Sequence, residues 1–329
     1  MINNGYKSLF YDSGSNHQIF VSIDGKKIAD NSSIEFESFE LEETLCSESD
    51  LTFGSCESNC IKLVLRGISS ILGKEIVVSE EITGSGLDPF IYGKYVVTSD
   101  VPTSDKTKRE IIAYDSMYEI LNCDVKSWYS SLVFPMSLRQ FRDSFFSHVG
   151  VEQVDVSLVN DRITINKTLV TTNSDSNTIT SESAISGKKV ITAICEINGC
   201  FGNINRDGKF EYVILDSITS ALYPSENLYP SDEVFPSDSN AESMTGKYIE
   251  FDYENFQTRN ITQLEIRNSS ESSGEIVGTT GNSYVISGNF LVSDKSGDDL
   301  RKIADNILPV ISKASFIPVK SSNCVGNPC

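Results

Sequence analysis

The stretch VITAICEINGCFGNINRDGKFEYVIL, residues 190–215, contains a helix followed by a hairpin and is the most informative part of the chain for its fold. Apolar residues at helical spacing predict a helix from Lys188 to Asn198, which Gly199 ends. The inward face of that helix is predicted to consist of Val190, Ile191, Ile194 and Ile197. This stretch therefore predicts a compact α-then-β unit.

The second half of the stretch predicts two strands, CFGNIN and KFEYVIL, joined through Arg206, Asp207 and Gly208. An Asp-Gly pair is a strong hairpin signal, because both central positions of the expected turn need positive φ. Asn203, Asn205 and Asp207 also alternate as ligands do in a calcium loop, but no Glu stands where such a loop needs a bidentate ligand. The turn explains these polar residues better than a metal site.

Upstream of this unit, the first third of the chain predicts short β-strands. The segment SIEFESFEL at 33–41 alternates at first, and CIKLVLR at 60–66 places Ile61, Leu63 and Leu65 on one face. Further strands are predicted for KEIVV at 74–78, KYVVTSD at 94–100 and REIIAYD at 109–115. Strands of this length and spacing indicate a barrel or a sandwich.

The region after residue 114 mixes helices with strands. Asp115 is a plausible N-cap for the helix SMYEILN, and Ser137 and Gln140 have the spacing of a capping box. The second helix ends at Gly150, with His148 near its C-terminal end, where the helix dipole favours a positive imidazole. Its buried face is predicted to be Leu138, Phe141, Phe145 and Val149. Strands are predicted at 154–159 and 162–170.

The last part of the chain begins with two connecting segments. Residues 171–187 are rich in Thr, Ser and Asn, and 221–237 repeats Tyr-Pro-Ser, Tyr-Pro-Ser and Phe-Pro-Ser with a period of six. The prolines exclude a helix or a central strand, so an extended strap anchored by its aromatic rings is expected. Strands then return, followed by a helix from about Asp298 to Ile311 that Pro309 should bend or end.

The charge of the chain disfavours polyanion binding. The 329 residues include 46 acidic and 27 basic side chains, for a net charge of −19. Proteins that hold DNA or RNA tightly are usually basic along one face, and the nearest cluster here, Lys106, Lys108 and Arg109, is interpreted as the solvated start of a strand. No apolar run is long enough to span a membrane, and the N-terminus does not resemble a secretory signal. Folding in a cytoplasm is therefore expected.

The eight cysteines do not predict a disulfide framework, because the chain is large enough to form hydrophobic cores and no secretory signal is seen. Cys56 and Cys60 are four residues apart, as zinc ligands can be, but the chain has no CxxC pair and only two histidines, His17 and His148. Reduced thiols, several of them buried, are the favoured interpretation.

The sequence shows no pattern typical of catalysis. Phosphate-binding glycine loops, the GxSxG elbow and the HExxH motif do not occur. Two carboxylates suffice for a glycosidase, so the composition alone does not exclude one, but nothing marks a particular pair. Glu35, Glu37, Glu40, Glu42 and Glu43 are interpreted as a solvated strand face rather than a catalytic pair. We therefore predict no enzyme activity, no catalytic residues, no metal site and no cofactor.

Five runs in the chain resemble the tail hub, or tail-tip, family of phages and prophages of Gram-positive bacteria, which is related to the baseplate hub of contractile tails. The resemblance extends from about residue 30 onward. It is carried by FGSCESNCIKLVL (53–65), TKREIIAYDSMYEILNCDV (107–125), SLRQFRDSFFSHVGVEQ (137–153), LVNDRITINKT (158–168) and VITAICEINGCFGNINRDGKFEYVIL (190–215). The family's chain usually continues beyond a GNP-type segment, so the native protein is expected to extend past Cys329.

The resemblance implies a mainly β fold with α+β parts. It implies a tube-like β-barrel domain at 1–114, an α+β domain at 115–180 and a helix plus β-hairpin unit at 181–220. The segment 221–329 would hold the Tyr-Pro-Ser linker and a second tube-like β domain with one helix.

The implied function is that of a structural hub in the virion tail, assembled in the bacterial cytoplasm. It would be a homotrimeric ring that adapts the tail tube to the tip and lines the DNA exit channel. Distal tail, tape-measure and tip or receptor-binding proteins would be its partners, with neither tight nucleic-acid binding nor a membrane span. The alternatives are a β-rich receptor- or carbohydrate-binding tail protein, with the aromatic repeat as ligand platform, and a cell-wall hydrolase. In the hub, the five glutamates named above would face the channel.

Overall fold

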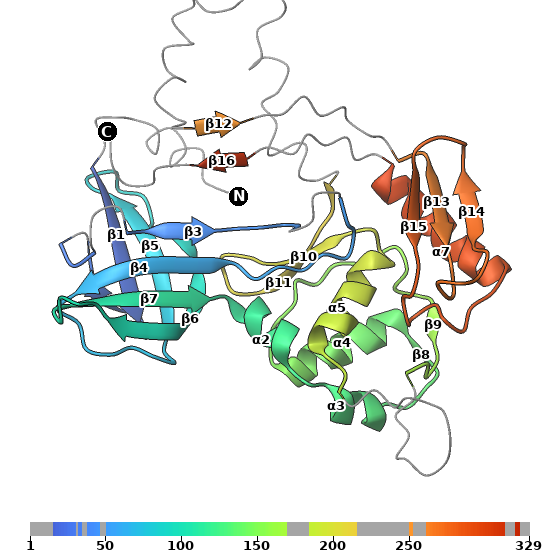
Figure 1. Cartoon of the computed structure of the whole chain (residues 1–329), viewed down its shortest axis with the longest axis horizontal. Helices are drawn as coiled ribbons and strands as arrows, with labels where there is room; N and C mark the ends of the chain where they lie inside the picture. The colour runs from blue at the N-terminus through green and yellow to red at the C-terminus, as the bar shows by residue number, and fades with distance from the viewer. Residues whose placement is uncertain are drawn as a thin grey trace, which may run out of the picture.

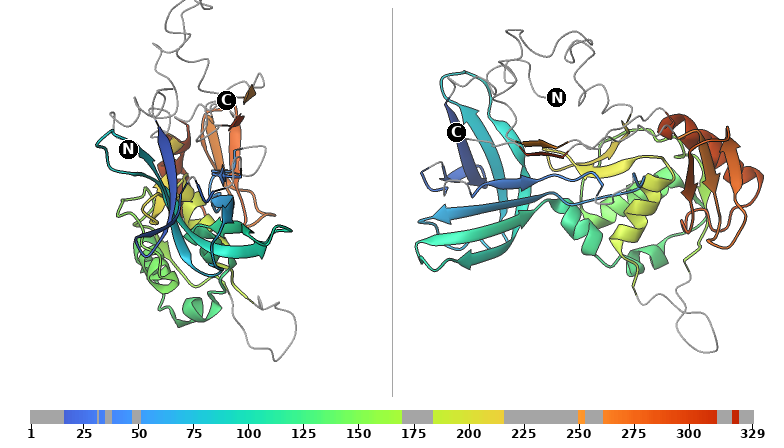
Figure 2. Two further views of the ribbon diagram at one scale, coloured as in Figure 1. Left: turned by 90° about the vertical axis from the view of Figure 1, so that its left-hand side faces the viewer. Right: turned by 45° about the horizontal axis from the view of Figure 1, so that its top comes forward.

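The structure is a computed structural model that describes residues 16–30, 32–34, 38–46, 51–169, 184–215, 250–252, 261–312 and 320–322. The described elements are mainly β with some helices, as the sequence predicts. They form three parts in a row, a sheet at one end, helices with a hairpin in the middle, and a small sheet with one helix at the other end (Figures 1 and 2). The Tyr-Pro-Ser repeat and Cys324 and Cys329 lie outside the described residues.

The first part is an antiparallel sheet of seven strands in the order β2-β1-β5-β6-β7-β4-β3. The strands are β1 (His17–Ile23), β2 (Lys26–Ala29), β3 (Glu40–Glu42), β4 (Cys60–Arg66), β5 (Glu75–Ile82), β6 (Phe90–Pro102) and β7 (Lys108–Tyr114). Among the described residues β2 and β3 pair on one side only, so this sheet is open and not the closed barrel that was expected.

The strand alternation predicted for β4 is confirmed. Ile61, Leu63 and Leu65 are at most 2% exposed, whereas Arg66 is exposed. The hairpin between β1 and β2 turns at Asp24 and Gly25, both of which have positive φ, as a two-residue turn of type I′ requires. Of the strand expected at 33–41, the described residues show the start of β3 at Glu40 and an isolated bridge at Ile34, while residues 35–37 lie outside the described part of the chain.

The middle part consists of short helices around a hairpin. Its elements are α2 (Ser116–Asn122), α3 (Lys126–Ser131), β8 (Met136–Ser137), α4 (Leu138–Val149), β9 (Thr164–Ile165), α5 (Gly187–Glu196), β10 (Phe201–Ile204) and β11 (Phe210–Val213). The predicted caps are confirmed. Asp115 caps α2, Ser137 and Gln140 form the capping box of α4, and Gly150 ends α4 with a φ of 74°.

Among the described residues, the strands predicted at 154–159 and 162–170 are wrong except for the two residues of β9, and Val170 lies outside the described residues. Hydrogen bonds from side chains hold this segment as a loop, since the Asp161 carboxylate accepts from the Leu158 N–H and the Asn198 side chain accepts from the Asn160 N–H. These bonds satisfy backbone groups that would otherwise need a neighbouring strand. Val154 and Val159 remain 36% and 42% exposed.

The hairpin of β10 and β11 is confirmed, but its predicted turn is wrong. Gly208 has a φ of 81°, whereas Asp207 does not have positive φ. The Asn205 side chain instead accepts hydrogen bonds from the N–H groups of Asp207 and Lys209, which closes a longer loop than the two-residue turn.

The third part is a mixed sheet in the order β14-β13-β15, packed against one helix. Its elements are β13 (Gln263–Ile266), β14 (Glu275–Gly278), β15 (Ser283–Ile286) and α7 (Asp298–Ile311), and a separate pair joins β12 (Glu250–Asp252) to β16 (Lys320–Ser322). The range predicted for α7 is confirmed, and Pro309 lies inside it, in the last turn. Pro309 has no N–H to donate within the helix, and α7 ends at Ile311, soon after it.

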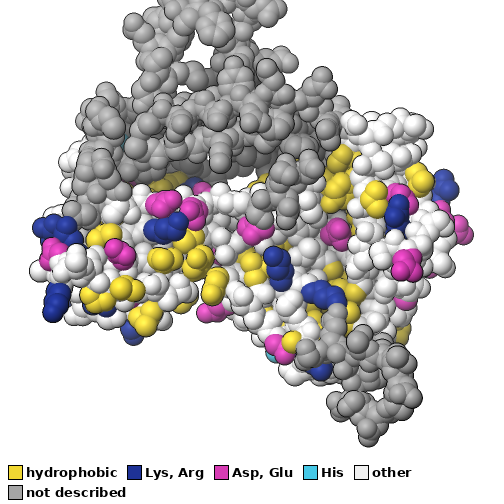
Figure 3. Space-filling view, in the orientation of Figure 1, with side chains coloured by type: hydrophobic (Ala, Val, Ile, Leu, Met, Phe, Trp, Pro, Cys, Tyr) yellow, Lys and Arg dark blue, Asp and Glu magenta, His cyan; other side chains and the backbone are white. Residues whose placement is uncertain are grey.

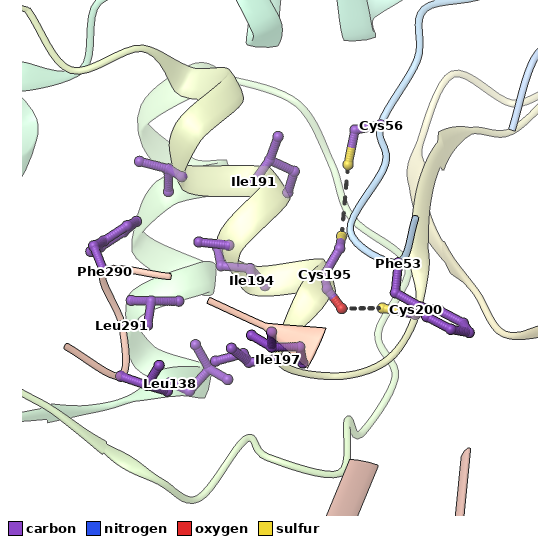
Figure 4. Close-up of a cluster of buried hydrophobic side chains, with 14 of the residues drawn as sticks. Phe53, Cys56, Leu138, Ile191, Ile194, Cys195, Ile197, Cys200, Phe290 and Leu291 are labelled. Carbon is purple, nitrogen blue, oxygen red and sulfur yellow. Dashed lines mark hydrogen bonds between the residues drawn. The ribbon is translucent and has the colours of Figure 1, made fainter. Parts of the chain in front are cut away.

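Two hydrophobic clusters underlie these parts. One fills the seven-stranded sheet, and the other joins the middle part to α7 and its sheet. In the second cluster Ile194 of α5 and Ile197, which follows α5, lie near Leu138 and Leu291 (Figure 4). All four residues predicted to face inward from this helix are fully buried. Among the described residues no helix combines the length and apolar character needed to cross a bilayer.

Candidate functional site

A large hollow lies between the first turns of α4, the loop at 157–164 and α7. Its volume is about 1330 Å³. It is lined by Ser137, Arg139, Gln140, Asp143, Ser157, Leu158, Val159, Asp161, Arg162, Ile163, Thr164, Lys295, Asp299, Lys302, Ile303 and Asn306. Most of these side chains are polar or charged, so the hollow is suited to binding a polar surface. The sequence did not single it out, because α7, which forms one of its walls, is far along the chain from α4 and the loop.

Asp161, which lines the hollow, forms a buried ion pair with Arg142. Arg142 is fully buried and binds Asp161 through both carboxylate oxygens, at 2.9 Å from Nε and 3.0 Å from Nη2. The guanidinium also donates to Gln153 Oε1 and to the Val156 carbonyl. Burial, the largest single influence, lowers the pKa of Arg142, but the hydrogen bonds and charges of Asp161 and Tyr212 together outweigh it, so the pKa of Arg142 is raised. These bonds fix the loop against α4.

The cations of the hollow differ in their pairing. Arg139 reaches Asp143 at 3.6 Å and also pairs with Asp155, and Lys295 Nζ lies 3.0 Å from Asp294. Arg162 and Lys302 are exposed. Neither forms an ion pair or a side-chain hydrogen bond within the described part of the chain.

The acidic stripe predicted from the sequence is only partly described. Glu35 and Glu37 lie outside the described residues, whereas Glu40, Glu42 and Glu43 are exposed. Lys62 Nζ of the neighbouring strand lies 2.7 Å from Glu42 and 3.5 Å from Glu40, so one cation partly offsets both carboxylates. On the face in Figure 3, acidic and basic side chains are interspersed.

The basic cluster Lys106, Lys108 and Arg109 is not uniformly solvated, which corrects the sequence interpretation. The Arg109 guanidinium pairs with Asp100, whose side chain is fully buried, and also donates to the Asp100 carbonyl oxygen at 3.3 Å. This pair joins β7 to β6, because a cation near a strand start can pair across the sheet. Lys106 is exposed, as expected.

Both histidines contact neighbouring side chains in structural settings. His17 contacts the buried Glu80 across β1 and β5, and Tyr92 donates a hydrogen bond to the same carboxylate. His148 is near the C-terminal end of α4, as predicted, and its ring stacks on Trp128 with centroids 5.9 Å apart.

Two other carboxyl groups, one buried and one partly buried, have raised pKa values and do not line the hollow. Burial raises the pKa of Asp115 to about 7, although the N–H groups of Asn59 and Met117 donate to it. Burial likewise raises the pKa of Glu196 to about 7, against a hydrogen bond from Asn289 at 2.8 Å. Each is engaged by hydrogen bonds that join separate segments, so their visible role is structural.

The cysteines are free thiols at the six described positions, four of them buried. Cys56 Sγ lies 3.8 Å from Cys195 Sγ on α5, and Cys200 Sγ approaches the Cys195 carbonyl oxygen at 3.4 Å (Figure 4). Burial raises the pKa of the Cys195 thiol well above its ordinary value. In the described residues no group of three His, Cys, Asp or Glu side chains is placed to hold a metal ion.

The chain is similar in structure to several solved proteins. The prophage MuSo2 43 kDa tail protein from Shewanella oneidensis matches with a TM-score of 0.46 and 12% identity, over 90% of this chain and 79% of that one. A tail protein from Neisseria meningitidis MC58 matches with a TM-score of 0.47 and 11% identity, over 88% and 74%.

A third similar structure is the Francisella PdpA-VgrG complex. It matches with a TM-score of 0.41 and 10% identity, over 84% of this chain and 40% of that one. No protein-family model matches the chain, and no curated protein matches it.

Proposed function

We propose that this protein is a structural component of a phage-type tail, and specifically a hub that forms a three-copy ring at the tail tip. The ring would join the tail tube to the tip proteins and surround the DNA exit channel. Its partners would be the distal tail, tape-measure and tip or receptor-binding proteins. The division into domains at 1–114, 115–180, 181–220 and 221–329 is part of this proposal.

One observation carries the proposal most directly. The five runs that resemble the hub family are separated in sequence, yet all contribute buried side chains to the same hydrophobic cluster. Examples are Phe53, Met117, Phe141, Ile165 and Ile191, one from each run. Residues that pack together in one core must change together to keep its volume. The resemblance therefore follows one folded body and not a set of unrelated short matches.

The open sheet is compatible with a ring. Among the described residues β2 and β3 each have one edge without a neighbouring strand. An unpaired edge is a natural place for another chain to continue a sheet. We propose that the tube-like wall is completed between subunits, which would reconcile an open sheet in one chain with a closed wall in the assembly.

Electron microscopy of assembled tail particles tests the proposal. We expect three copies of the chain around the tail axis, at the junction of tube and tip. Six copies around the axis, or a peripheral position, would contradict the hub. A chain that releases soluble fragments from cell walls would instead indicate a hydrolase.

A further inference from the structure

We propose that the hollow between α4 and α7 is a docking surface for acidic side chains of a second copy of this chain. The inference rests on the three-copy ring proposed above and names one surface that would join its subunits. It is carried by the size of the hollow, the pairing of its charges and the charge of the whole chain.

The size and lining of the hollow disfavour a small-molecule site. Its volume of about 1330 Å³ exceeds the ~300–1,000 Å³ that is usual for such sites. Small-molecule sites are also lined mainly by hydrophobic and aromatic side chains, whereas 12 of the 16 side chains that line this hollow are polar or charged. A surface segment of another protein matches these properties better.

The charges left uncompensated in the hollow favour an anionic occupant. Arg162, from the loop, and Lys302, from α7, both line the hollow, and neither has an ion pair in the described residues. The acidic groups Asp143 and Asp161 are already engaged, by Gln153 and by Arg142 respectively.

One acidic group remains on the rim. Asp299 is exposed in the first turn of α7, where a carboxylate suits the helix dipole. The unpaired cations Arg162 and Lys302 therefore outnumber the one unpaired carboxylate among the described lining residues. Arg is also enriched in protein interfaces.

The acidic occupant is available from the chain itself. Each copy carries a net charge of −19, so three copies carry three times 19, or 57, formal negative charges. Bringing such copies together costs self-repulsion unless cations of one copy meet carboxylates of the next. Arg162 and Lys302, which are unpaired among the described residues, are cations that could meet the carboxylates of a second copy.

The walls are held in position before any partner arrives. The Arg142–Asp161 pair fixes the loop, and the Asn306 side chain of α7 donates to the Asn160 side chain at 2.9 Å. A surface held in this way loses little conformational entropy when it is covered.

The test compares two charge-reversal variants of the full chain. Arg162→Glu with Lys302→Glu reverses the unpaired cations of the hollow. Lys167→Glu with Arg301→Glu makes the same change at exposed cations that stand nearby but do not line it. Sedimentation over a range of chain concentrations up to about millimolar, at low and high salt, measures self-association of each.

We expect wild-type self-association that weakens with salt, and a dissociation constant at least about tenfold higher for the first variant. The matched control should stay within about twofold of wild type. Equal effects of the two variants would overturn the inference, as would wild-type chain that stays monomeric throughout the range. Particles with three copies but a solvent-filled hollow would also overturn it and leave the hub intact, whereas particles without three copies would refute the hub itself.

Discussion

Arg142 is a single buried polar side chain that holds separate segments of the fold together. The side chain reaches Asp161, Gln153 and Val156 from α4 and so joins the helix to two stretches of the loop that follows it. Burying such a pair has a large desolvation cost, and removing one partner leaves the other charge uncompensated. Asp115 and Glu196 represent the opposite case. Asp115 is buried and Glu196 is partly buried, neither forms an ion pair among the described residues, and their pKa values rise to about 7.

We predict that Arg142→Met lowers the free energy of unfolding by about 3–5 kcal/mol, because Asp161 would remain as a buried unpaired charge. Urea unfolding followed by the fluorescence of Trp128, the only tryptophan, measures this, since its ring lies 5.4 Å from Phe145 of α4. Arg139→Met is the control. Its side chain is 40% exposed, so the expected cost is below about 1 kcal/mol. Equal losses in the two variants would contradict this account.

We also predict a pH dependence from Asp115. A folded-state pKa of about 7, raised from 3.8, means that the folded protein binds this proton more readily than the unfolded chain. Stability is therefore lost as pH rises through that window, at up to about 1.4 kcal/mol per unit. Asp115→Asn removes this titrating group. The unfolding free energy of the variant should therefore rise relative to that of wild type as the pH increases from about 4 to 7. Parallel denaturation curves of the two proteins across that window would refute the prediction.

Elements in this protein pack closely where glycine allows it. Gly187, the first residue of α5, lies so near α2 that a Cβ there would stand 2.0 Å from the Ile120 carbonyl oxygen. The Gly187 N–H also donates to the Cys123 carbonyl at 2.9 Å. The contact between the two helices thus depends on a missing side chain.

We predict that Gly187→Ala destabilises the fold by about 1–3 kcal/mol or more, since the clash is with backbone and not with a movable side chain. Lys188→Ala, the next residue of α5, is exposed and should change stability by less than about 0.5 kcal/mol. Thermal unfolding of both variants measures the difference. A Gly187→Ala protein as stable as wild type would show that α2 and α5 move apart without cost.

On the scale of the whole molecule, the acidic charge bears directly on the proposed hub. If the chain surrounds a channel that passes DNA, like charge on the channel wall would prevent retention of the DNA. The described glutamates Glu40 and Glu42 share Lys62, so this strand is less negative than its sequence suggests.

We predict weak retention of the chain on immobilised duplex DNA, even at low salt, where the attraction of basic proteins is strongest. We also expect acidic side chains to be enriched on the inner wall of the ring. Tight retention, or a wall lined by Lys and Arg in a map of the assembled tip, would remove the channel model. Any acidic protein would be retained weakly on DNA. The map of the assembled tip is therefore the decisive measurement.

Local signals in the sequence determined much of the secondary structure. The capping box at Ser137, the stop at Gly150 and the buried face of α5 were predictable because caps and helical periodicity depend on residues within about one turn of each other. The same holds for β4, whose alternation follows from the two-residue period of a strand.

Only the tertiary structure decided how these elements meet. The segment at 154–159 has a strand-like pattern, yet the contacts of Asp161 with Arg142 and of Asn160 with Asn198 hold it as a loop, and both partners come from other elements. Three other features depend likewise on residues distant in sequence. They are the hollow, the position of Lys62 between two glutamates and the burial of Asp115. Burial and charge pairing are properties of spatial neighbours, which no local pattern encodes.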